Sequence, residues 1–122
     1  MATILVVEDN ADNLFLTVVL LQSVGHAVLT AVDAEAGLAL ARHDKPDLIL
    51  MDVQLPGMDG LAATRLLKAD ESTRAIPVIA LTALAMTGDE ARIRAAGCDA
   101  YIAKPMRMND FLAAVAAQLV AT

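Results

Sequence analysis

Four apolar, strand-like runs in this chain of 122 residues end in residues that can do chemistry. The residues are Glu8 and Asp9, Asp52, Thr82 and Lys104. In a parallel sheet the carboxyl ends of the strands share one edge, where ligands usually bind. We therefore expect three carboxylates, one hydroxyl and one ammonium group to meet at a single site.

The three acids predict a metal site. Glu8, Asp9 and Asp52 would repel one another in one cleft, and the repulsion would raise their pKa values unless a cation compensated it. Mg²⁺ prefers oxygen ligands and keeps several waters when few carboxylates bind it, so positions stay open for a phosphoryl oxygen. We expect Mg²⁺ here, with Mn²⁺ as a substitute ion.

The same residues predict a phosphoryl acceptor. The carboxylate of Asp52 is a nucleophile that can form an acyl phosphate. Phosphoryl transfer needs in-line positioning and neutralisation of the phosphoryl oxygens. Mg²⁺, Lys104 and the hydroxyl of Thr82 suit that second requirement.

The elements that must position these residues follow a βαβ pattern, in which short apolar runs alternate with stretches of helical period. The predicted strands are Ile4–Val7, Ala27–Ala31, Leu48–Met51, Val78–Leu81 and Ala100–Ala103. The predicted helices are Ala11–Val24, Ala34–His43, Gly60–Lys68, Gly88–Ala96 and Met108–Val120. The first, third and fourth strands are apolar throughout, which indicates interior positions in the sheet.

Two of these helices show an apolar stripe with the i, i+3, i+4, i+7 spacing that packs on a sheet. The first helix has Leu14, Thr17, Val18 and Leu21 at this spacing. The last helix has Leu112, Val115, Ala116 and Leu119. We expect both stripes to face the sheet.

Composition narrows the classes of partner and location. The chain is 57% hydrophobic and 20% charged, with a net charge of −6. This charge opposes binding to nucleic acid and to anionic membrane surfaces. The residues after Met1 lack the basic and apolar regions of a signal peptide, and the longest apolar stretch is well short of the roughly 18 residues that a membrane span needs. We expect a soluble, cytoplasmic protein of one domain, residues 1–122, with no effector domain.

Three residues with reactive side chains are interpreted as structural. Cys98 is the only cysteine, so an intramolecular disulfide is excluded. It follows Gly97 at the start of a strand, where a small buried hydrophobic residue is the simplest interpretation. His26 and His43 have no partner at a metal-ligand spacing, and we expect them to be solvated or capping residues.

The chain resembles the receiver domains of two-component response regulators. The segments that carry the resemblance are Val6–Asn10, Pro46–Asp52, Leu55–Gly60, Ala80–Ala83 and Gly97–Pro105. The resemblance extends over essentially the whole chain. The chain is most similar to the stand-alone subgroup of receivers, with a CheY-like general form and a sequence closer to those of DivK-type regulators. The resemblance implies an α/β, flavodoxin-like fold with a five-stranded parallel sheet in the order 2-1-3-4-5 and five helices on both faces.

The resemblance also implies roles for the site residues. Asp52 would take a phosphoryl group from a histidine kinase or a histidine phosphotransfer protein. Glu8, Asp9 and the backbone carbonyl of Gln54 would hold Mg²⁺ together with Asp52, and Lys104 would pair with the phosphoryl group. Glu8 stands where many receivers have Asp, and its longer side chain could alter the geometry of the metal site.

Thr82 and Tyr101 match the switch pair of the family, and Lys104–Pro105 matches its usual cis peptide bond. The expected output is binding of a downstream protein through the fourth helix, the fifth strand and the fifth helix. Three methionines, Met86, Met106 and Met108, are expected around that surface. The kinase, the target, the lifetime of the acyl phosphate and the oligomeric state do not follow from the sequence.

Three alternatives compete with a stand-alone receiver. A haloacid dehalogenase-like phosphohydrolase needs a second acid two residues after its nucleophile, where this chain has Gln54. A flavodoxin needs a loop rich in Ser, Thr or Gly after the first strand, and this chain lacks one. A receiver domain detached from a hybrid histidine kinase would share every motif. No enzyme activity is expected beyond self-phosphorylation from a phosphoryl donor and slow autodephosphorylation.

Overall fold

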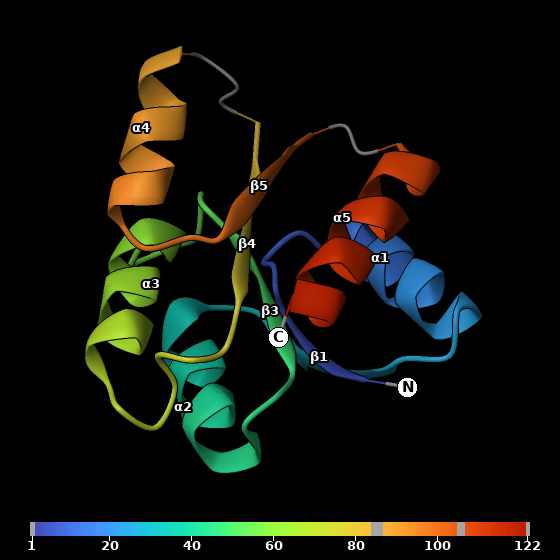
Figure 1. The fold of residues 1–122 in the computed structure, drawn as a ribbon, viewed down its shortest axis with the longest axis horizontal. Helices are drawn as coiled ribbons and strands as arrows, with labels where there is room; N and C mark the ends of the chain where they lie inside the picture. Colours follow the sequence, from blue (N-terminus) through green and yellow to red (C-terminus); the bar gives the residue numbers. More distant parts are fainter. Residues whose placement is uncertain (1, 84–86, 105–106, 122) are drawn as a thin grey trace.

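The structure is a computed structural model that describes residues 2–83, 87–104 and 107–121. Strands and helices alternate along the chain (Figure 1). The strands are β1 (Thr3–Val7), β2 (Ala27–Ala31), β3 (Leu48–Asp52), β4 (Val78–Thr82) and β5 (Ala100–Ala103). The helices are α1 (Ala11–Ser23), α2 (Ala34–Asp44), α3 (Gly60–Ala69), α4 (Thr87–Ala95) and α5 (Met108–Ala121).

The five strands form one parallel sheet in the order β2-β1-β3-β4-β5, which confirms the predicted topology. Every residue of β3 and β4 is buried, as are Ile4–Val7 of β1. The apolar runs therefore occupy the three interior strands, as expected for strands that are covered on both faces. In the described part of the chain, no helix is both long and apolar enough to cross a membrane.

The helices cover both faces of the sheet. Helices α1 and α5 lie on one face, and α2, α3 and α4 lie on the other (Figure 1). Side chains alternate along β1, so that Ile4 and Val6 join the core under α1 and α5, whereas Leu5 and Val7 join the core under the other three helices.

Two strands extend one residue further at their carboxyl ends than predicted. Asp52 is the last residue of β3 and Thr82 the last residue of β4. Asp52 pairs with Leu81 in the β3–β4 register, so the acidic residue is part of the parallel ladder rather than of the turn after it. The position of its side chain is therefore set by the sheet.

The predicted stripes of the first and last helices are partly right. On α1, Thr17 and Leu21 are buried and Leu14 packs against the core on the same face of the sheet. On α5, Val115 is buried and Leu112 and Leu119 pack against that core, as predicted. Ala116 is instead exposed, and Phe111, which is outside the predicted stripe, is buried. A ring at Phe111 buries far more apolar area than a methyl group at Ala116, so it decides which side of α5 faces the sheet.

The amino ends of β4 and β5 are tied together by Lys68 of α3. Its Nζ donates to the backbone carbonyls of Arg74 and Ile76, at 3.2 and 2.8 Å, and to a carboxylate oxygen of Asp99 at 3.1 Å. The same oxygen of Asp99 accepts from the backbone N–H of Val78, the first residue of β4, at 2.8 Å. One ammonium group thus joins a helix and the two loops that precede these strands.

Cys98 is buried, and its Sγ lies 3.8 Å from Oγ1 of Thr64. Burial raises the pKa of its thiol, which lowers the fraction of reactive thiolate at neutral pH. We predict that a disulfide reagent such as dithionitrobenzoate modifies the native protein at least about tenfold more slowly than the protein in concentrated urea. Equal rates in the two conditions would contradict the structural interpretation of this cysteine.

Candidate functional site

The three predicted acids come together at the carboxyl edge of the sheet. Carboxylate oxygens of Glu8, Asp9 and Asp52 all lie within 4.8 Å of one another. Glu8 and Asp52 are 1% and 4% exposed, whereas Asp9 is open to solvent. Among the described residues, these three are the one group of His, Cys, Asp or Glu that could hold a metal ion.

Lys104 lies inside this acid cluster. Its Nζ is 3.1 Å from Oδ2 of Asp52 and 3.3 and 3.2 Å from the two oxygens of Glu8. Lys104 follows β5, Asp52 is the last residue of β3, and Glu8 follows β1. The contacts therefore join residues that are far apart in the sequence. The structure thus brings the predicted cation to the predicted acceptor.

The electrostatics of the cluster are those of crowded carboxylates. Burial, together with the neighbouring carboxyl of Asp52, raises the pKa of Glu8 to about 7 against the opposing effect of Lys104. Burial acts to lower the pKa of Lys104, but its bonds to Asp52 and Glu8 outweigh burial and raise it, so the ammonium group stays charged. Carboxyl pKa values rise where several acids lie close together with too little positive charge nearby.

This donor set suits a hard divalent cation. The candidate ligands are carboxylate oxygens, which Mg²⁺ prefers to nitrogen or sulfur ligands. The exposed Asp9 leaves one side of the group open to water, and Mg²⁺ sites usually retain several waters. The residues present therefore fit a magnesium ion.

The loop after β3 holds the second oxygen of Asp52. The backbone N–H of Gln54 donates to Oδ1 of Asp52 at 2.9 Å, so the two carboxylate oxygens have different partners. The carbonyl of Gln54 as a metal ligand stays a prediction. The other oxygen of Asp52, Oδ2, contacts the ammonium group of Lys104.

Thr82 and Tyr101 lie on neighbouring strands. Thr82 is buried at the end of β4, and its carbonyl accepts from the backbone N–H of Lys104 at 2.7 Å. Tyr101 is half-buried in β5, where it pairs with Ala80. Thr82 directly follows Leu81, which pairs with Asp52, whereas Tyr101 is two residues before the end of β5. The role of Thr82 and Tyr101 as a switch pair stays a prediction.

Sequence reasoning missed two residues of the site. The amide Nδ2 of Asn13, in α1, donates to Oε1 of Glu8 at 3.2 Å. Gly60 begins α3, and its N–H donates to the carbonyl of Val53 at 3.0 Å. A Cβ built at Gly60 would overlap the carbonyl oxygen of Asp52 and lie 2.8 Å from the carbonyl carbon. Asn13 could have been found from the sequence, because it is a polar residue in the first turn of the helix that follows Glu8 and Asp9.

Some expectations lie outside the described residues. These are Met86, Met106 and the Lys104–Pro105 peptide bond. Met108 is described, and it is 55% exposed at the start of α5. His26 accepts a hydrogen bond from the backbone N–H of Ala2, and His43 lies exposed beside Asp44, as expected for structural residues.

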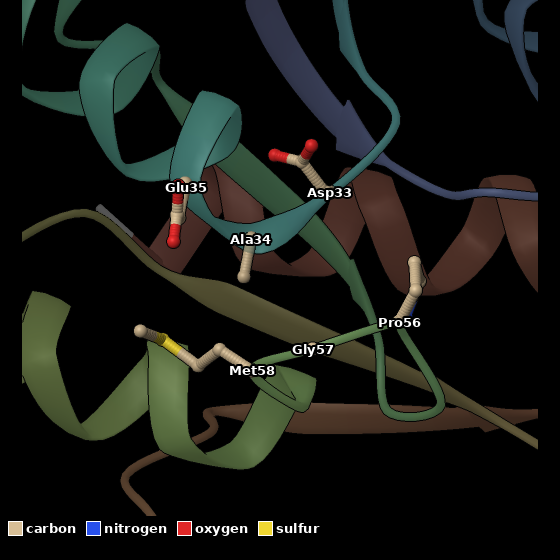
Figure 2. Close-up of a pocket in the computed structure, with 6 residues that line it drawn as sticks. All are labelled: Asp33, Ala34, Glu35, Pro56, Gly57 and Met58. Carbon is tan, nitrogen blue, oxygen red and sulfur yellow. The ribbon is translucent and has the colours of Figure 1, made fainter.

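A hollow on the same edge of the sheet is lined by residues other than the three acids. It has a volume of about 280 Å³, with Asp33, Ala34 and Glu35 at the start of α2 on one wall and Pro56, Gly57 and Met58 on the other (Figure 2). The carboxylate of Asp33 is already used, since it accepts from the N–H of Ala36 and caps α2. We assign no ligand to this hollow.

Comparison with known proteins decides the family. The sequence model of the response regulator receiver domain matches residues 4–116. This chain belongs to that family. The match leaves the phosphohydrolase alternative without support, and the receiver fold agrees with the topology described above.

Curated relatives of this receiver include two proteins named polar-differentiation response regulator DivK. The one from Brucella anthropi is 45% identical and the one from Brucella ovis 46% identical. Each alignment covers 96% of this chain and 95% of the relative. The chain is thus similar to DivK proteins over nearly their full length.

Solved structures of similar receivers agree with the fold. The receiver domain of a sensor histidine kinase from Pseudomonas aeruginosa is 36% identical, with a TM-score of 0.90 and 97% of both chains covered. That structure has a magnesium ion coordinated in its active site cleft. Chemotaxis protein CheY4 of Vibrio cholerae is 26% identical, with a TM-score of 0.91, and the alignment covers 96% of this receiver and 98% of CheY4.

Proposed function

We propose that this receiver accepts a phosphoryl group on Asp52 from the phosphohistidine of a histidine kinase or a histidine phosphotransfer protein. The observation that carries the proposal is the position of Asp52, which is buried at the end of an interior strand with Oδ2 3.1 Å from Nζ of Lys104. Two further carboxylates within 4.8 Å support a metal requirement.

The proposed step is a single displacement at phosphorus. A carboxylate oxygen of Asp52 attacks the phosphorus atom, an O–P bond forms, and the P–N bond to the donor imidazole breaks with its electron pair on the ring nitrogen. Water later breaks the new O–P bond, which releases inorganic phosphate and restores the carboxylate. Beyond this self-phosphorylation and slow self-dephosphorylation, we propose no enzyme activity.

Each neighbouring residue has a task in this step. Lys104 places positive charge where the phosphoryl oxygens arrive, and the N–H of Gln54 holds one oxygen of Asp52 in place. Glu8, Asp9, Asp52 and the carbonyl of Gln54 would hold Mg²⁺. When bound, this ion neutralises the phosphoryl oxygens and the crowded carboxylates. Mn²⁺, which also prefers oxygen ligands, is the expected substitute.

The test of this function is labelling with a small phosphoryl donor. We expect acetyl phosphate with Mg²⁺ to add one phosphoryl group, observed by intact mass, and EDTA to suppress the addition by at least about tenfold. Restoring Mg²⁺ in excess should restore labelling. Labelling that is unchanged in EDTA would contradict the metal requirement.

The proposed output is a change in binding to a downstream protein through α4, β5 and α5. Thr82 and Tyr101 lie on strands that pair with each other, which supports their role in coupling Asp52 to this surface. A net charge of −6 argues against DNA and anionic membranes as targets. A reducing cytoplasm, in which Cys98 stays a thiol, is the proposed location.

Thr82→Ala tests the coupling. We expect the variant to accept a phosphoryl group but to lose most of the difference in partner affinity between the two phosphorylation states, a coupling of about 1–3 kcal/mol. The measurement is titration of the cognate kinase domain with and without beryllofluoride, a phosphoryl mimic. A full response in the variant would rule Thr82 out of the switch.

Two arrangements of the receiver remain as proposals. Near-complete coverage of the DivK relatives supports one receiver domain, residues 1–122, that acts without an effector domain. Similarity to the receiver domain of a sensor histidine kinase supports a receiver that belongs to a hybrid kinase. The acceptor chemistry at Asp52 is the same in both, so the labelling experiment applies to either.

A further inference from the structure

The ring of Tyr101 has a cation above it. The guanidinium carbon of Arg94, in the last turn of α4, lies 6.0 Å from the centre of the ring. This separation is within the range of a cation–π interaction. Glu90, one turn earlier on α4, positions the same guanidinium group, since its Oε1 is 3.4 Å from Nε of Arg94.

Tyr101 and Thr82 share one face of the sheet. The β4–β5 register pairs Ala80 with Tyr101 and Thr82 with Ala103, and side chains alternate along strands, so these four residues point to the same side. That side is the one covered by α4, because Ala80 belongs to the core under α2, α3 and α4 and Tyr101 packs against this core. Thr82 is therefore the residue toward which the ring would turn on moving inward.

The contact with Arg94 is made on the solvent side of this face. The side chain of Arg94 is 55% exposed, and Tyr101 is half-buried. A ring turned inward toward Thr82 would be buried more deeply than it is now. The guanidinium group of Arg94, which is paired with Glu90 at the surface, could stay in contact with that ring only by losing its hydration, which is costly for a charged group. The interaction is therefore available to the outward ring and is lost by the inward one.

We propose that Arg94 is a positioning residue that holds the ring of Tyr101 outward and so opposes the switch. This inference rests on the proposed switch role of Tyr101. A ligand or contact can shift a two-state equilibrium only by its differential interaction with the two states. A cation–π contact at an exposed position is expected to change the ratio of outward to inward ring about two- to fivefold.

The test uses the fact that Tyr101 is the only tyrosine in the chain. Carbon-13 labelling of the tyrosine ring therefore gives NMR signals from this residue alone. We expect Arg94→Gln to move the ring signals toward their beryllofluoride-bound position before any beryllofluoride is added. The same variant should reach the bound position at about two- to fivefold lower beryllofluoride concentration than wild type.

Two further variants separate positioning from a general charge effect. Arg94→Lys keeps the charge but loses the planar group that stacks on a ring, so its signals should lie between those of wild type and Arg94→Gln. Arg65→Gln removes one positive charge from an exposed position on α3 and should behave as wild type. An equal shift in Arg65→Gln and Arg94→Gln would overturn the proposal.

The remaining outcomes distinguish this inference from the function on which it rests. If beryllofluoride moves the wild-type ring signals and Arg94→Gln is identical to wild type throughout, the role of Arg94 is wrong and the switch stands. If the wild-type signals do not respond to beryllofluoride, the switch role of Tyr101 fails and the inference fails with it. Labelling of Asp52, followed by mass, tests phosphoryl acceptance independently of both.

Discussion

Asp52→Asn should abolish phosphoryl labelling of this receiver. The amide is nearly the same size as the carboxylate, and it can still accept the hydrogen bond from the N–H of Gln54. It has no anionic oxygen to attack phosphorus, so the nucleophile is lost while the shape of the site is kept. Intact mass after incubation with acetyl phosphate and Mg²⁺ should show no phosphoryl adduct above background.

Asp59→Asn is the matched control for this variant. Asp59 is an exposed aspartate on the same loop, and it caps α3 by accepting from the N–H of Ala62. Asparagine caps helices about as well as aspartate, so the fold should be unaffected and labelling should equal that of wild type. An undiminished adduct in Asp52→Asn would mean that another residue is the acceptor.

Gly60→Ala should destabilise the protein and disturb the acceptor together. A Cβ at this position would overlap the carbonyl oxygen of Asp52 and lie 3.0 Å from Cγ of Met51. Backbone cannot give way as a flexible side chain can, so either α3 or the end of β3 must move. We expect a loss of about 1–3 kcal/mol in the free energy of unfolding, measured by urea denaturation, and slower labelling of Asp52.

Gly57→Ala provides the comparison. Gly57 is in the same loop with φ of +73°, but nothing lies within 4 Å of a Cβ built there. The cost should be the conformational one alone, on the order of 1 kcal/mol, with labelling unchanged. If Gly60→Ala lowered the free energy of unfolding no more than Gly57→Ala, close packing of α3 against Asp52 would not be the reason for a glycine at position 60.

The sequence alone was sufficient to predict the sheet and the acid cluster. Apolar runs that are continuous over four or five residues gave the interior strands, and the acids at their ends had one edge of the sheet on which to meet. The contact of Lys104 with Asp52 also followed, because Lys104 comes directly after β5 of that same sheet.

The orientations of the helices were harder to predict. Helix α1 is apolar nearly all round, so periodicity could not show that Phe15 would be 72% exposed. The hydrogen bond from Asn13 to Glu8 and the closeness of Gly60 to Asp52 depend on how a helix packs on the sheet. Such contacts join elements across the fold, and local pattern carries little information about them.

Lys68 anchors the amino end of β4. Its ammonium group and the carboxylate of Asp99 anchor the chain just before Val78, at the edge of the sheet opposite Asp52. Thr82 lies at the other end of the strand, directly after Leu81, which pairs with Asp52. Any displacement that begins at the acceptor should therefore pivot about a fixed amino end, and its amplitude should grow toward Thr82 and the start of α4. The expected motion of β4 is then a rotation about its amino end rather than a translation along the strand.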